Sequence, residues 1–429
     1  MLSLIVVIST IILIIASILF FPTIVIKKKI VISTYWPIAT IGALILLISK
    51  GISIKEIGKS WMDKTIGPLP ILILFISMTI LSIFLDEVGF FKYLALKATK
   101  KAKGSQYKIF IYLYLLTSIL TIFTSNDIII LTFTPFICYF SRNAKINPVP
   151  YLLSEFVAAN TWSMMLLIGN PTNIYISTSL NIDFFTYLKM MFLPTLAVGI
   201  VSFILLMIIF HKQLQEKINN DIEENININK TLLIIGLIHL SACIALLTVS
   251  SYINIPMWKI TAIFAISLLV LVLIYFGLKK EVPTILLKTL KRAPVALAPF
   301  LLSMFTFVYV IGKDGYIEKM SLFLMKYENV FTYGLSSFIF CNLVNNIPMS
   351  VLFAEILNIT NGSSNLTYAV IASSNIGAYL TPIGALAGIM WMGILKEQNI
   401  KFSFAKFFKY GICLAVPSIL VALAIISII

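Results

Sequence analysis

One acidic residue in this sequence lies where a carboxylate is costly. Residues 124–135 read TSNDIIILTFTP, so Asp127 stands between two apolar runs. Within a lipid bilayer such a charge costs about 3 kcal/mol or more unless it pairs, is protonated or meets water, and it is functional by default. Asp127 is therefore a candidate to bind Na⁺ or to carry a proton. The alternative is that Asn126 or Asp127 only caps the helix that follows.

Two further carboxylates, Glu155 and Glu355, also lie within apolar sequence. Both are candidates for proton coupling, although Glu155 lies near the start of its apolar run and could instead extend to the membrane surface. Cys138 and Cys341 are expected to behave as small hydrophobic residues. The sequence has no HExxH motif, no Ser–His pair and no phosphate loop, so we predict no enzymatic activity, no catalytic residue, no cofactor and no metal site.

The composition places these residues in a membrane protein. Of the 429 residues, 60% are hydrophobic and 11% are charged, and the mean hydropathy is +1.02. A soluble domain has about 25% charged residues. The net charge of +15 comes from lysines in short loops, which is typical of the cytoplasmic side of a membrane protein and does not indicate nucleic-acid binding.

Eight apolar runs are long enough to cross a bilayer, which needs about 20 residues. They are Leu2–Phe21, which we interpret as a span and not a signal peptide, Val31–Ser49, Pro68–Leu85, Met190–Phe210, Thr231–Ser250, Ile260–Phe276, Val295–Ile311 and Tyr410–Ile429. Residues 107–140 and 330–357 each carry polar residues at their centre, which predicts a re-entrant hairpin with a buried polar tip. Residues 151–180 and 367–395 are interrupted by IGNPTN and YLTPIG, and their prolines predict broken helices.

Backbone groups freed at membrane depth are tolerated only where they line a cavity, so the tips and breaks predict a binding site. Polar residues just before each break are expected to line it, although close helix packing is an alternative. The predicted substrate or ion site comprises Ser125, Asn126, Asp127, Asn160, Thr161, Gly169, Asn170, Pro171, Thr172, Asn173, Asn345, Asn346, Ser374, Asn375, Thr381 and Pro382.

The two halves of the chain share one order of elements: two spans, one span, a hairpin, a broken span and one span. Residues 75–96 resemble residues 300–322 at an offset of 226, which aligns Gly89 with Gly315. Five crossings per half is an odd number, so the second half is predicted to be inverted. We therefore predict an all-α polytopic membrane protein with one repeat over 1–210, a cytoplasmic linker over 211–230 and a second repeat over 231–429.

Loop charges orient this topology. The side that follows the first span collects 23 of the 32 basic residues, including Lys27–Lys29 and the six lysines between Lys92 and Lys108. The positive-inside rule makes this side cytoplasmic, with both termini outside a multi-pass plasma-membrane protein. The only two arginines, Arg142 and Arg292, lie in loops. A dianion would favour a bidentate arginine, so the predicted solute is neutral or cationic.

Several motifs resemble the ion transporter superfamily: Asn126-Asp127 followed by LTFTPF, then GNPTNIYIS, CNLVNNIPMS and LTPIGALAGIMWMGIL. Residues 340–429 are most similar to arsenite-efflux permeases, whereas GNPTN is more similar to sodium–proton antiporters and citrate-type carriers. The resemblance implies scaffold and transport domains, a substrate between two hairpin tips, elevator-like motion and often a homodimer. For an arsenite permease it also implies a cytoplasmic ATPase subunit as partner.

The sequence departs from the family patterns at two places. Asp127 and Asn346 replace the threonine that dicarboxylate carriers carry at the tips, and Asn160 replaces an acidic residue of arsenite permeases. Our hypothesis is a secondary transporter that exports arsenite or antimonite in exchange for H⁺. The alternatives are a Na⁺/H⁺ antiporter and a citrate-type anion permease, and the alternative from another class is a membrane-embedded enzyme.

Overall fold

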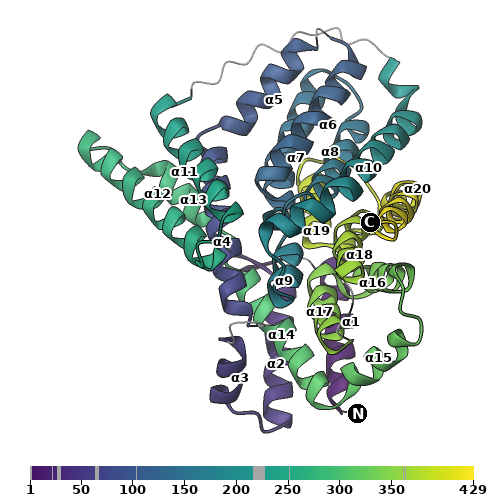
Figure 1. Cartoon of the computed structure of the whole chain (residues 1–429). Helices are drawn as coiled ribbons and strands as arrows, with labels where there is room; N and C mark the ends of the chain where they lie inside the picture. Colours follow the sequence, from purple (N-terminus) through teal and green to yellow (C-terminus); the bar gives the residue numbers. More distant parts are fainter. Residues whose placement is uncertain are drawn as a thin grey trace.

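The structure is a computed structural model that describes residues 2–21, 23–26, 30–62, 67–102, 104–215, 228–250, 252–360, 362 and 364–429. It is almost entirely helical (Figure 1). The predicted linker over 211–230 falls largely outside these residues, and so do Lys27–Lys29.

The first half of the chain contains a long series of helices with one short pair of strands. They are α1 (Leu2–Phe20), β1 (Thr23–Ile26), β2 (Ile30–Ser33), α2 (Tyr35–Ser49), α3 (Ile54–Trp61), α4 (Pro68–Glu87), α5 (Phe90–Lys101), α6 (Gln106–Phe123), α7 (Asn126–Asn143), α8 (Val149–Trp162), η1 (Leu167–Gly169), α9 (Pro171–Ser179), α10 (Phe184–Phe210) and η2 (Gln213–Gln215).

The second half repeats this order of helices without the strands. It consists of α11 (Lys230–Thr248), α12 (Met257–Lys279), α13 (Thr284–Arg292), α14 (Leu297–Lys313), α15 (Tyr316–Met325), α16 (Val330–Val344), α17 (Asn346–Thr360), α18 (Ser364–Ile376), η3 (Gly377–Tyr379), η4 (Pro382–Gly384), α19 (Leu386–Glu397) and α20 (Phe404–Ile426).

All eight predicted spans are helical, with shifted boundaries. Among the described residues, seven helices have the length and composition needed to cross a membrane. The span predicted from Val31 begins only at Tyr35, because residues 30–33 pair with residues 23–26 in an antiparallel hairpin. Four short helices, α3, α5, α13 and α15, are absent from the prediction, since they are too short and too polar to register as spans.

The two predicted hairpins are helix pairs. α6 and α7 have 18 residues each, α16 and α17 have 15 each, and each pair turns at the predicted polar tip. An 18-residue helix is about 27 Å long, close to the thickness of the hydrocarbon layer. Length alone therefore does not separate a re-entrant hairpin from two short crossings, and re-entry stays a prediction.

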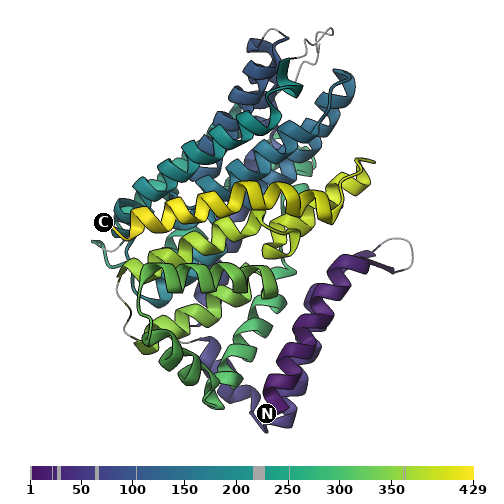
Figure 2. The same ribbon diagram turned by 90° about the vertical axis from the view of Figure 1, so that its right-hand side faces the viewer.

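Helices of the two halves pack against each other in matching pairs. α2 packs on α14, and α12 packs on α4. Each hairpin also contacts the broken helix of the other half: α7 lies against α19, and α17 lies against α9. Figure 1 shows the first hairpin beside α8 and α10, with α3 and the N-terminus at the bottom, and Figure 2 shows α1 along the side of the bundle.

A left-handed glycine begins the helix after α4 and the helix after α14. Gly89 has φ 92° and Gly315 has φ 75°, conformations that side chains other than glycine rarely adopt. These are the two glycines that the sequence aligned at an offset of 226. The matching backbone turn explains why both positions require glycine.

Ion pairs fix the far ends of α4 and α14. Arg292 of α13 lies 2.7 Å from Asp86 and 2.6 Å from Glu87 at the end of α4. Lys313 at the end of α14 lies 2.5 Å from Glu56 of α3. Because α14 follows α13 directly and ends at α3, we name the two ends of the bundle the α13 end and the α3 end.

Candidate functional site

The two helix breaks are buried, and at two of their glycines the packing leaves no room for a side chain. A Cβ on Gly169 would lie 2.3 Å from the carbonyl oxygen of Ser163, and one on Gly384 would lie 2.4 Å from that of Gly377. The proline after each break starts a new helical turn, Pro171 in α9 and Pro382 in η4. The predicted breaks are confirmed. At each break, one segment of backbone lies directly against another.

Asn375 joins the two breaks through side-chain hydrogen bonds. Its Oδ1 accepts from the Ser163 hydroxyl and from Asn170 Nδ2, each at 2.9 Å, and its Nδ2 donates to Asn173 Oδ1 at 2.7 Å. All four side chains are at most 1% exposed. Residues more than 200 positions apart thus form one polar centre.

Hydroxyl groups extend this centre on both sides. Thr172 Oγ1 lies 3.0 Å from Asn170 Oδ1 and 3.0 Å from Ser374 Oγ. Thr161 donates to the hydroxyl of Tyr379 over 3.4 Å. Tyr379 was not among the predicted residues, because an aromatic residue beside a break looks like ordinary apolar packing in the sequence.

The first hairpin tip presents oxygen atoms without partners. Asn126 Nδ2 donates to Asn160 Oδ1 at 3.0 Å, which ties the tip to α8. In the described part of the chain, Ser125 Oγ and Asn126 Oδ1 have no hydrogen-bond partner although both are buried. Buried polar atoms normally have partners, so these two oxygens are exceptions that the described residues do not satisfy.

Asp127 is half-buried and follows the tip directly. The charge of Asp127 acts on the Tyr35 phenol of α2. Tyr35 in turn packs edge-on against Phe300 of α14, with ring centroids 5.2 Å apart. Ser125, not Asp127, holds the position that precedes α7, so the capping alternative does not explain the carboxylate.

The second hairpin tip is closed by its own amides. Asn345 has φ 82°, and its Nδ2 donates to the Ile383 carbonyl at 2.9 Å, while Asn346 reaches the Ser374 carbonyl at 3.5 Å. Thr381 donates to Asn342 Oδ1 at 2.8 Å, a partner that the sequence prediction missed. The second tip therefore holds the second break in place.

The two cysteines of the hairpins are buried, and Cys341 lies behind the second tip. Its Sγ is 3.1 Å from the Gly384 carbonyl, a contact within the protein. Among the described residues no cluster of histidine, cysteine or acidic side chains could hold a metal ion.

The remaining two acids differ in their surroundings. Glu155 is 1% exposed and accepts a hydrogen bond from the Thr134 hydroxyl at 3.2 Å. The alternative that Glu155 extends to the membrane surface is therefore wrong: α8 buries it against α7. Glu355 is partly exposed and lines a cavity described below.

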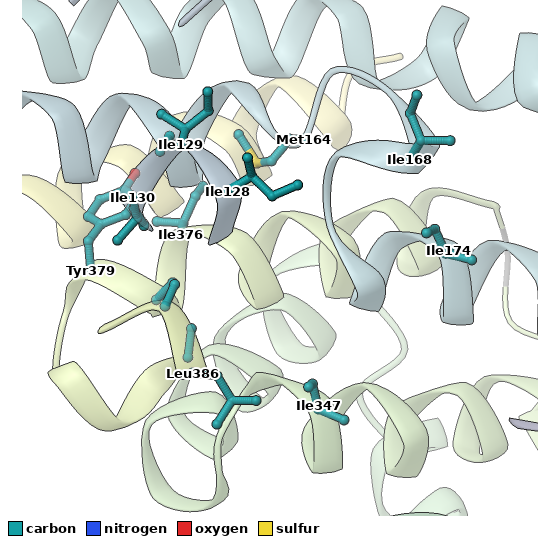
Figure 3. Packing of buried hydrophobic residues seen from close by; sticks show 14 of the residues in the cluster. Ile128, Ile129, Ile130, Met164, Ile168, Ile174, Ile347, Ile376, Tyr379 and Leu386 are labelled. Atoms are coloured by element: carbon teal, nitrogen blue, oxygen red, sulfur yellow. The ribbon is translucent and has the colours of Figure 1, made fainter. Parts of the chain in front are cut away.

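Apolar side chains surround the polar centre. Figure 3 shows isoleucines of α7 near the two breaks, together with side chains of α9, α17 and α19. The labelled residues are Ile128, Ile129, Ile130, Met164, Ile168, Ile174, Ile347, Ile376, Tyr379 and Leu386, each at most 8% exposed. Because these surroundings are apolar, hydrogen bonds within the polar centre are stronger than they would be at a surface.

Neither arginine reaches the site. Arg142 donates to the backbone carbonyl of Gln398 at 3.0 Å, and Arg292 is held by Asp86 and Glu87. The site thus consists of amides, hydroxyls and a half-buried carboxylate, which suits a neutral or cationic solute.

We expect Gly169→Ala to destabilise the protein by about 1–3 kcal/mol, the usual cost of forcing an extra methyl group into a filled core. The new Cβ would overlap the Ser163 backbone, which cannot move without separating the two breaks. The matched control is Gly393→Ala on α19, where a Cβ has nothing within 4 Å. Melting temperatures in detergent would check this; equal values for the two variants would contradict it.

Three comparisons place the chain among known proteins. The model of the family described as "Citrate transporter" (CitMHS) matches residues 23–365. The chain is 27% identical over 421 residues to the "Putative arsenical pump membrane protein" of Bacillus subtilis, covering 90% of this chain and 92% of that protein. It is 25% identical over 409 residues to the "Arsenical pump membrane protein" of Escherichia coli, with 91% and 92% covered.

The fold also matches a solved structure. The transporter YdaH of Alcanivorax borkumensis superposes with a TM-score of 0.55 at 11% identity, covering 99% of this chain and 96% of that one. At this identity the likeness concerns the fold alone. Together with the family match over most of the chain, it confirms the resemblance to the ion transporter superfamily. The chain is a membrane transporter that belongs to the CitMHS citrate transporter family.

Proposed function

We propose that this chain exports arsenite or antimonite across the plasma membrane in exchange for protons. The observation that carries the proposal is the arginine-free centre of buried amides and hydroxyls around Asn375, in a chain that matches arsenical pump proteins over nearly their whole length. Arsenite is a neutral trihydroxide near pH 7. Amides and hydroxyls can donate to and accept from such a solute without a compensating charge.

The proposed binding position is the first tip and the adjoining breaks. Ser125 Oγ and Asn126 Oδ1 are unpartnered among the described residues, and the N-terminus of α7 adds free N–H groups beside them. Asp127, next to these atoms, is the proposed proton carrier. A proton carrier must release its proton when solute binds and take one up when solute leaves. A half-buried position at the edge of the site allows the carboxyl to be either protonated or ionised.

We further infer that the two halves are inverted repeats with re-entrant hairpins. The common order of elements, the matching helix pairs and the two left-handed glycines support this arrangement. In transporters built this way the substrate lies near the membrane midplane between the repeats. Cytoplasmic placement of the lysine-rich loops, a homodimer and an ATPase partner stay predictions.

The test is arsenite uptake into energised, everted membrane vesicles that contain the protein. We expect accumulation above that of vesicles without the protein, and its loss when a protonophore removes the proton gradient. Arsenite accumulation that is the same with and without the protonophore would contradict proton coupling. No accumulation at all would contradict the choice of substrate.

One observation favours a second candidate, Na⁺/H⁺ antiport. Ser125, Asn126 and Asp127 follow one another at the first tip, each carries a side-chain oxygen, and hard cations bind through oxygen. Sodium-dependent dissipation of a proton gradient in the same vesicles, without arsenite accumulation, would favour this candidate.

A further inference from the structure

A cavity of about 530 Å³ opens near the α3 end, between α3, α14, α15 and α17. Its lining includes Glu56, Phe305, Tyr309, Lys313, Glu318 and Glu355. Glu355 is partly exposed to this space and lies on α17, the helix that begins at the second hairpin tip. The cavity therefore opens beside an acid on a helix that begins at the second tip.

The cavity has further charged groups in its lining, from α3, α14 and α15. Lys313 lies 2.5 Å from Glu56, and the Tyr309 hydroxyl donates to Glu56 at 2.8 Å. Hydrogen bonding from Lys313 lowers the pKa of the Glu56 carboxyl. Glu318 is exposed on α15. The titratable groups that face Glu355 across this cavity are Glu56 and Lys59 from α3, Tyr309 and Lys313 from α14, and Glu318 from α15.

Tyr175 of α9 lies directly behind the cavity wall. Its ring packs edge-on against Phe305, with centroids 4.8 Å apart, and Phe305 lines the cavity. Tyr175 is 2% exposed, and its hydroxyl has no hydrogen-bond partner among the described residues. The charge of Glu355 acts on this phenol, as expected from the packing of α9 on α17.

α9 leads from Tyr175 back to the polar centre. One helical turn before Tyr175 it begins at Pro171, and Thr172 and Asn173 belong to the network around Asn375. A phenol can accept a proton on oxygen while releasing its own, so it can relay protons without holding a charge. Tyr175 thus lies between an acid at the α3-end cavity and the first helix break.

The cavity at the opposite end has the reverse charge. It measures about 590 Å³ and is lined by Ile18, Pro382 and the lysines Lys396 and Lys401, with no acidic residue among its described lining. α1 starts beside Asp314 at the α3 end, so Ile18 near its other end faces the α13 end. The α3-end cavity has three acidic residues and two lysines in its lining, whereas this cavity has two lysines and no acidic residue, so the α3 end attracts cations more strongly.

We propose that Glu355 and Tyr175 form the route by which protons pass between the α3-end cavity and the binding site. Glu355 takes a proton from the cavity and passes one to the Tyr175 hydroxyl, which accepts it while releasing its own proton to the binding site at the start of α9, for the proton carrier Asp127. Release in the opposite direction uses the same two groups. The proposal rests on proton coupling in the proposed function and names the path that the coupling uses.

The test compares two kinds of transport for Glu355→Gln and Tyr175→Phe in reconstituted vesicles. Net arsenite accumulation driven by a proton gradient should fall about 100-fold in Glu355→Gln, the lower end of what a positioned proton-transfer group contributes. Exchange of labelled for unlabelled arsenite, which moves no net proton, should stay at the wild-type rate. Tyr175→Phe should show the same split with a smaller loss, and Glu318→Gln on the exposed rim should match the wild type.

Two outcomes would overturn the proposal: Glu355→Gln with normal gradient-driven accumulation, or Glu355→Gln that loses exchange as strongly as accumulation. A second measurement does not depend on the substrate. The wild-type protein is treated with a carbodiimide, which modifies protonated carboxyls, and the sites are read by mass spectrometry. We expect modification of Glu355 that increases as the pH falls; an unmodified Glu355 over the whole range contradicts the proposal even if arsenite is not the substrate.

Discussion

Replacing Asp127 by asparagine is expected to abolish proton-driven accumulation of the solute. The substitution keeps the size of the side chain and removes the only group at the first tip that can carry a proton. Losing one charged interaction with the solute or the coupling ion costs about 1.5–3 kcal/mol, which corresponds to about 10–100-fold in binding. Vesicle transport with and without a proton gradient would measure the effect.

The matched control for Asp127→Asn is Asp183→Asn. Asp183 caps α10, where its carboxylate accepts from the backbone N–H groups of Phe185 and Thr186, and an asparagine can keep these bonds. Transport by this control should stay near the wild-type level. Intact coupled transport in Asp127→Asn would remove Asp127 from the mechanism.

The second large effect is expected from Asn375→Leu. Leucine would leave Asn170 Nδ2 and Asn173 Oδ1 without their partner, whereas the Ser163 hydroxyl keeps its bond to the Asn160 carbonyl, and each buried polar group that loses its bond costs about 1–3 kcal/mol. Two such groups together cost about 2–6 kcal/mol, a large part of the stability of many proteins. We expect loss of transport together with a lower melting temperature and a smaller folded yield in detergent.

The exposed Asn143 at the end of α7 provides the control, because Asn143→Leu makes the same chemical change outside the network. Its melting temperature should stay within a few degrees of the wild type, as for most surface substitutions. If Asn375→Leu were equally harmless, the two breaks would be held together by apolar packing and not by the amide network.

Much of this architecture can be predicted from the sequence because polar residues are rare at membrane depth. The Ser125-Asn126-Asp127 tip and the prolines Pro171 and Pro382 interrupt apolar runs, and the structure has a turn or a break at each of them. The family motifs add the prediction that these elements meet. Burial of the tip and break residues in one region agrees with it.

The partners within the site could not be predicted in the same way. Asn375 bonds to Asn170 and Asn173, and nothing in a single sequence selects these pairs from the other amides. Asn342 and Tyr379 lie within the quoted stretches CNLVNNIPMS and YLTPIG, but they were missed because a single sequence does not show that their side chains contact Thr381 and Thr161. The β1–β2 hairpin was missed because Val31–Ser33 is as apolar as the helix that follows.

In the ion pairs at the ends of α4 and α14, the two halves of the chain carry opposite charges. At the α3 end, Glu56 of α3 pairs with Lys313 of α14, so the first half supplies the acid and the second half the base. At the α13 end, Glu87 of α4 pairs with Arg292 of α13, so again the first half supplies the acid and the second half the base. Two copies of the first half would place Glu56 against Glu87, and two copies of the second would place Arg292 against Lys313. Like charges so close repel. If the halves arose by duplication of one ancestral unit, their charges have since become complementary. Each half is then attracted to the other half, whereas two copies of the same half would repel each other at these positions.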